Sequence, residues 1–246
     1  MMRPPALPNA GAAAVAILIV VLGYSLPEGA AMASTAFDRF RFSFLEDKNS
    51  AREGLDIADL VQLSGDERVK AEDMLIAFLP DTRAVIGLGE LHSKRAEPKL
   101  EALFDAERLA LRASAAGLTP DIRSPDEMSY LTKALWQIRP DSRRIDGAID
   151  VLGHADEWVW RHTAAEALSV VCHPSAVVAL TKALDDSEGL VRYQAALGLL
   201  AIHGLPAPPV EPKNMVYRVM SADAATQEGG KHDILAAIAG RPLCAS

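Results

Sequence analysis

The chain has 246 residues, of which 50% are hydrophobic and only 5% aromatic, and its formal net charge is −8 at pH 7. This length suits one large domain or a short array of repeats. The negative charge excludes the global positive field with which proteins attract phosphates, so we expect no nucleic acid partner. Alanine and leucine dominate the composition, which favours an all-α fold.

Residues 1–33 are predicted to lie outside the fold, as a signal peptide or membrane anchor. Residues 10–26 are uncharged and mostly apolar, with the length of a signal core or a marginal anchor. Ala31-Met32-Ala33 matches a signal peptidase site, and cleavage there makes Ser34 the first residue. We therefore expect an exported, periplasmic or membrane-anchored protein that meets a membrane only through this segment. The alternative is that translation starts at Met32 and the protein is cytoplasmic.

Residues 34–64 are expected to cap the N-terminal end of the fold. Aromatic and polar residues alternate from Phe37 to Leu45, a period typical of a strand. Such a segment would cover the open end of a repeat array or, alternatively, offer an edge that a partner extends. Helices are expected over 51–64 and over 66–79, the second with Asp66 as its N-cap.

A repeat of about 30 residues is the strongest pattern in the chain and predicts a repeat domain over residues 65–205. The segments R-H-T-A-A-E-A-L, which starts at Arg161, and R-Y-Q-A-A-L-G-L, which starts at Arg192, superimpose residue by residue. A similar shift relates Arg83 to Arg112. Paired helices with this period are typical of an α-solenoid. The four arginines are expected to be structural. The aspartate that ends one helix pair is expected either to accept hydrogen bonds from the arginine that opens the next pair or to cap that arginine's helix.

The register of the repeats slips in the middle of the domain. The separation of Arg112 from Arg161 is much longer than that of Arg161 from Arg192, which indicates one inserted helix among helices at about 125–137 and 142–153. The second helices of the pairs are expected to line a concave face suited to a peptide or a folded partner. They are placed at about 96–104, 125–137 and 174–184.

The end of the chain is predicted to be a linker and a cap. Prolines interrupt residues 206–214, which cannot continue a helix. The tail over 215–246 contains a short amphipathic pattern near 231–239, with Gly240 placed as its C-cap. We expect this helix to close the C-terminal end of the array.

Three motifs carry a family resemblance. They are D-D-x-x-x-x-V-R at Asp185 to Arg192, A-A-x-x-L at Ala195 to Leu199, and H-P-S-A-V-x-A-L at His173 to Leu180. These repeats resemble the short HEAT-like repeats of bacterial proteins and phycobilisome lyases. The resemblance implies an α-solenoid of stacked antiparallel helix pairs with irregular caps at both ends. It also implies a non-catalytic scaffold that binds a protein or peptide, with a lyase-like enzyme or accessory handling a cofactor or chromophore as the alternative.

No residue set in the sequence identifies a reaction, so no catalytic, metal or cofactor-binding residue and no cofactor is expected. The six histidines lack the H-E-x-x-H spacing of a metal site, and no nucleophile motif is found. Glycines in G-L-G-E at 87–90 are expected to allow close helix packing rather than to bind phosphate. Cys172, on the apolar face of a predicted helix, and Cys244 are both expected to be free thiols, which leaves the redox compartment open.

The predicted partner-binding surface combines tryptophans and arginines, the residue types that dominate interface hot spots. Its members are Trp136, Arg139, Arg143, Arg144, Trp158 and Trp160. The alternative is that the tryptophans fill the core at an irregular junction. Because Trp158 and Trp160 alternate, they cannot share one helical face, so at least one should be partly exposed. The partner is expected to be a protein or peptide, and the chain itself a monomer.

Overall fold

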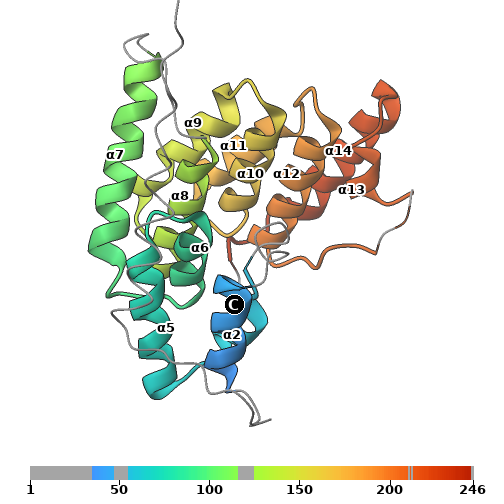
Figure 1. Ribbon diagram of the computed structural model, residues 1–246. Helices are drawn as coiled ribbons and strands as arrows, with labels where there is room; N and C mark the ends of the chain where they lie inside the picture. The colour runs from blue at the N-terminus through green and yellow to red at the C-terminus, as the bar shows by residue number, and fades with distance from the viewer. Residues whose placement is uncertain (1–34, 47–54, 116–124, 210, 212, 245–246) are drawn as a thin grey trace, which may run out of the picture. The chain divides into compact units, whose positions relative to one another are not determined.

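The computed structural model describes residues 35–46, 55–115, 125–209, 211 and 213–244 (Figure 1). Within these ranges the regular secondary structure is all helical and no strand occurs, which confirms the predicted all-α class. The helices are α2 (Ala36–Leu45), α4 (Ile57–Val61), α5 (Gly65–Phe78), α6 (Thr82–Glu90), α7 (Glu97–Ala115), α8 (Asp126–Ile138), the 3-10 helix η1 (Ser142–Arg144), α9 (Asp146–His154), α10 (Trp158–Leu168), α11 (Pro174–Ala183), α12 (Gly189–Ile202), α13 (Met215–Arg218) and α14 (Ala224–Ile238).

Alternate helices form a row in which each contacts the next. The row runs α6, α8, α10, α12, and α14 contacts α12 at its end. Helix α9 packs against α8 and α10 and also contacts α11, so it belongs with α11 beside the row. The prediction that the helix at 125–137 is a second helix of a pair is therefore wrong, because α8 lies in the row, whereas α9 lies beside it. Arg112 falls near the end of α7, whereas Arg83, Arg161 and Arg192 lie in the first turns of α6, α10 and α12.

Small side chains let the helices of the row approach closely. Ala164, Ala165, Ala195 and Ala196 are fully buried. Gly89 lies where α6 meets α8, and a Cβ added there would be 2.7 Å from the Cα of Ala134. The packing role predicted for the glycines at 87–90 is thus confirmed at this position.

The strand predicted over Phe37 to Leu45 is wrong, because this segment is helix α2. Phe37, Phe40 and Phe44 are buried, since spacings of three and four residues place them on one helical face. Phe42 lies off that face and is 56% exposed. The Phe44 ring contacts the edge of Phe78 with centroids 5.2 Å apart, which docks α2 on α5.

Two expected helix boundaries also shift. The helix expected over 51–64 is only the short α4, with Asp56 as its N-cap, and residues 51–54 lie outside the described ranges. Helix α5 begins directly after Ser64, so Asp66 lies in its first turn and is not its N-cap.

At the other end of the chain, α14 begins at Ala224, well before the helix predicted near 231–239. Gly240 follows it with a φ of +72°, a conformation that glycine adopts without a steric cost. The described part of the predicted linker, residues 206–209, 211 and 213–214, forms no helix.

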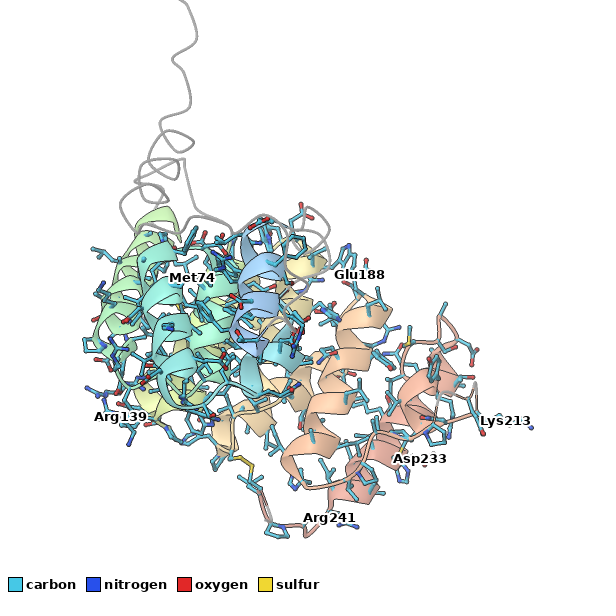
Figure 2. All side chains as sticks on the ribbon, turned by 60° about the horizontal axis from the view of Figure 1, so that its bottom comes forward. Met74, Arg139, Glu188, Lys213, Asp233 and Arg241 are labelled. Atoms are coloured by element: carbon cyan, nitrogen blue, oxygen red, sulfur yellow. A yellow bond between two sulfur atoms is a disulfide. The ribbon has the colours of Figure 1, made fainter. Side chains whose placement is uncertain are left out.

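Cys172 and Cys244 form a disulfide, so the prediction that both are free thiols is wrong (Figure 2). Helix α10 ends at Leu168, and Cys172 is therefore exposed in the loop before α11 rather than packed on a helical face. The Cα atoms of the two cysteines are 5.8 Å apart. The backbone amide of Cys244 also donates to the carbonyl of Ile202. The C-terminal tail is thus fastened to both the α10–α11 loop and the end of α12.

The described helices include none that is both long and apolar enough to cross a membrane. The predicted signal or anchor at residues 1–33 lies outside the described ranges.

Candidate functional site

Two arginines hold the first turns of α10 and α12 in the same way. Nη1 of Arg161 donates to the carbonyls of residues 155–156, at 2.9 Å each. Nη1 of Arg192 donates to the carbonyls of residues 186–187, at 2.7 and 3.0 Å. In both repeats the acceptors stand at the same positions relative to the arginine. The sequence repeat is therefore also a repeat of hydrogen bonds.

Each arginine also reaches forward to the segment that follows the next helix. Arg161 donates through Nε and Nη2 to the carboxylate of Asp186, at 2.8 and 2.9 Å. Arg192 donates to the carbonyls of residues 219–221. The expected direction of this ladder is wrong at Arg192, because Asp186 pairs with Arg161 of the preceding repeat and not with Arg192. It is confirmed at Arg83, which pairs with Asp81 between α5 and α6. Asp186 also accepts from the Glu188 amide just before α12, the capping role expected as the alternative.

Asp186 is held as a carboxylate in this arrangement. Burial acts to raise its pKa, but hydrogen bonds from the Arg161 guanidinium and the Glu188 amide lower it more. The pKa of Asp186 therefore lies below its ordinary value. Asp186 and Arg161 satisfy each other, and together they form part of the wall of a groove.

The groove has a volume of about 850 Å³ and lies between α9 and α11, which are neighbours beside the row (Figure 1). Its apolar lining includes Ile149 and Leu152 from α9, and Val178 and Ala179 from α11. Val178 is 70% exposed, as much as any large hydrophobic side chain in the described ranges. The groove thus offers apolar surface that nothing in the described chain covers.

Negative charge prevails along the groove. Its lining contains four aspartates against one arginine and one lysine, namely Asp150, Asp156, Asp185, Asp186, Arg161 and Lys182. Asp186 is neutralised by Arg161, and Asp185 by Lys231 of α14, at 2.6 Å. Asp150 and Asp156 are exposed to solvent. Two carboxylates are thus available to a ligand, with Lys182 as the opposing charge.

Exposed apolar side chains also lie at the starts of α10 and α12, two helices of the row. Trp158 and Val159, at the start of α10, are 37% and 47% exposed. Leu190, at the start of α12, is 45% exposed and occupies the same position in its repeat as Val159 does in the preceding one. Trp158 precedes Arg161 of the groove lining by three residues, so the two side chains are neighbours on α10 and Trp158 adjoins the groove at that end.

Two of the six predicted partner-binding residues are buried. Trp136 is 8% exposed and belongs to the core. Arg144 is 4% exposed; it donates to the carbonyls of Leu135 and Arg139 and forms ion pairs with Glu97 and Glu101. It joins α7 to the end of α8, so neither residue offers a surface to a partner. The hydrogen bond from Arg144 is the main reason that the pKa of Glu97 is lowered.

The other two arginines are exposed but already paired. Arg139 projects outward in Figure 2, and its Nε contacts the Glu97 carboxylate at 2.6 Å. Arg143 has a side chain that is 80% exposed and pairs with Asp141 at 2.5 Å, and this hydrogen bond lowers the pKa of Asp141.

The structure does not bring the six residues into one surface. Arg139, Arg143 and Arg144 precede α9, whereas Trp158 and Trp160 follow it, and this helix spans about 13 Å. Trp160 packs against the core, while Trp158 is partly exposed. The prediction that at least one of the two tryptophans is exposed is confirmed. Of the six residues, only Trp158 lies beside the groove. The groove itself was not predicted from the sequence.

Within the described ranges, no group of three or more histidine, cysteine, aspartate or glutamate side chains is placed to hold a metal ion. Comparison of the chain with protein-family models, with curated proteins and with solved structures found no match.

Proposed function

We propose that the protein is a non-catalytic scaffold that binds a protein or peptide partner in the groove between α9 and α11. The observation that carries the proposal is the groove itself, which joins an uncovered apolar lining at Val178 to a volume typical of ligand sites. Exposed apolar surface beside a polar rim is a mark of interaction sites. The partner is expected to meet a monomer of this chain.

The proposal includes the architecture. We propose that the helices are HEAT-like repeats stacked as an α-solenoid with irregular ends. Support comes from the shared hydrogen bonds of Arg161 and Arg192 and from the row in which alternate helices contact each other. In such folds the helices beside the row form an extended binding face, and α9 and α11 occupy that place.

We also propose that the chain matures in an oxidising compartment after export through residues 1–33. The disulfide between Cys172 and Cys244 supports this, because disulfides persist in the periplasm and outside the cell but are rare in the cytosol. Mass spectrometry of the native protein should give Ser34 as its first residue, with cysteines that are alkylated only after reduction. A chain that begins at Met32 or Ala33 and has freely alkylated cysteines would contradict the proposal.

Site-specific crosslinking tests the groove. A photoreactive benzoylphenylalanine at Val178 should crosslink, in the native host, to one protein that can then be identified. Leu109 on α7 is the matched control, since it is equally exposed at 70%. The identified protein, once purified, should bind the wild type more tightly than Val178→Asn. Identical crosslinking patterns from both positions would count against the groove.

A further inference from the structure

We infer that the groove accepts a cationic amphipathic segment, in which lysine or arginine side chains stand beside apolar ones. The inference rests on the proposed function and adds the chemistry of the partner to it. Two independent features lead to this inference. The groove has carboxylates that no cation of its lining balances, and apolar side chains are exposed in it and beside it.

The first feature is charge. Asp186 is paired with Arg161, and Asp185 with Lys231. Of the charged side chains in the lining, this leaves the carboxylates of Asp150 and Asp156 and the ammonium of Lys182. Glu157 and Glu188 follow the lining residues Asp156 and Ser187 in the chain; both are exposed, and neither caps its helix by a hydrogen bond. A cationic segment gains from these carboxylates, whereas an anionic one is repelled.

The second feature is apolar surface that lies among those carboxylates. Val178 lies in the middle of α11 in the groove, and Trp158 is exposed on α10 one turn before Arg161 of the lining. A purely polar cationic chain would leave these side chains in water. An amphipathic segment covers them while its charges meet Asp150 and Asp156.

The Arg161–Asp186 pair in the groove wall does not take part in recognition. The Arg161 guanidinium donates to two carbonyls and to both oxygens of Asp186. Asp186 accepts in addition from the Glu188 amide. Because both side chains are occupied, a ligand must be recognised by the exposed carboxylates of Asp150 and Asp156.

Labelled model peptides test the inference directly. One probe is an amphipathic peptide of leucine and lysine, and the other is its counterpart with each lysine replaced by glutamate. Fluorescence anisotropy with the full chain should show binding of the lysine peptide alone. That binding should weaken as salt rises, because the Debye length shortens from about 30 Å at 0.01 M to about 8 Å at 0.15 M.

Variants locate the binding on the molecule. Asp150→Asn with Asp156→Asn should weaken binding of the lysine peptide about tenfold and reduce its salt dependence. The double variant Asp66→Asn with Asp105→Asn removes the same charge from exposed positions on α5 and α7, and should leave binding unchanged. Val178→Asn should weaken binding about tenfold, whereas Leu109→Asn should not.

The outcomes separate this inference from the function it rests on. Preference for the glutamate peptide, with a loss in Val178→Asn, would overturn the cationic partner and leave the groove as a binding site. Self-association that rises with protein concentration and is lost in Val178→Asn would make a second copy the occupant and would also overturn it. Failure of both peptides to bind, or binding indifferent to Val178→Asn, would overturn the inference, and indifference would count against the groove as well.

Discussion

Arg192 binds the carbonyls of two separate loops to one side chain. It is 6% exposed, and its guanidinium donates to the carbonyls of residues 186–187 and of residues 219–221. Buried carbonyls need donors, and the planar fork of arginine supplies several in fixed directions. A lysine ammonium has three donors on one atom and cannot reach both loops.

Arg192→Lys should therefore lower the free energy of unfolding by about 2 kcal/mol, because carbonyls in both loops lose their donors. Urea denaturation followed by circular dichroism measures this change. Arg143→Lys is the control: its side chain is 80% exposed, so a change within about 0.5 kcal/mol is expected. Equal stability of the two variants would show that the carbonyl network contributes little.

The Arg161–Asp186 pair makes stability depend on pH. Because the folded-state pKa of Asp186 is below its unfolded value of about 3.9, the unfolded chain binds more protons as the solution is acidified. The contribution of the pair is complete above that unfolded pKa and is lost as pH falls through the folded pKa. The stability difference between wild type and Asp186→Asn should shrink as pH falls from about 5 to about 2.

Comparison with Asp186→Asn separates this effect from that of the other carboxylates with lowered pKa, such as Glu97 and Asp141, because both proteins retain them. Urea titrations at each pH give the two free energies. A stability difference that stays constant across this range would contradict the assignment.

At the level of helices, close approach sets the packing of α6 against α8. A Cβ on Gly89 would lie 2.7 Å from the Cα of Ala134, a backbone atom that cannot move aside. Gly89→Ala should lower the free energy of unfolding by about 2 kcal/mol through overpacking. Gly153 in α9 has no atom within 4 Å of the same position, so Gly153→Ala should raise stability by about 0.5 to 1 kcal/mol. Thermal unfolding of both variants checks the opposite signs, and equal signs would contradict this packing.

Sequence reasoning recovered the helices whose apolar pattern was unambiguous. The match between the segments that start at Arg161 and Arg192 predicted equivalent helices, and α10 and α12 each begin three residues before the matched arginine. It failed at Phe37 to Leu45, where alternation suggested a strand. There, burial of three rings on one helical face outweighed the alternating period.

The groove could not be predicted in the same way. Its lining comes from α9 and α11, which are separated along the chain by α10, and it depends on the packing of both helices against the row. Because the repeat register slips in the middle of the domain, the helix at 125–137 was wrongly assigned as a second helix of a pair. The tryptophan and arginine pattern predicted a binding surface that includes Trp136 and Arg144, which the fold buries. Of its six residues only Trp158 lies beside the groove.

On the scale of the whole folded unit, the C-terminal segment is held at several points. Arg192 bonds the end of α13, Lys231 pairs with Asp185, and the disulfide joins Cys244 to Cys172. The first contact holds the residues that follow α13 against α12, and the second joins α14 to Asp185 of the groove lining. The covalent link fastens the tail to the loop that opens α11. The groove is thereby supported by residues at the far end of the sequence.

The disulfide should make a large contribution to the stability of this unit. It joins cysteines 72 residues apart, and the loop-closure entropy removed from the unfolded chain corresponds to about 4 kcal/mol. Cys172→Ser with Cys244→Ser should lose about that amount in urea denaturation, and dithiothreitol should lower the wild type to the same level. The serine variant should not respond to the reductant. Because both cysteines are exposed, burial of the serines adds no cost of its own, so a variant as stable as the oxidised wild type would show that the tail needs no covalent link.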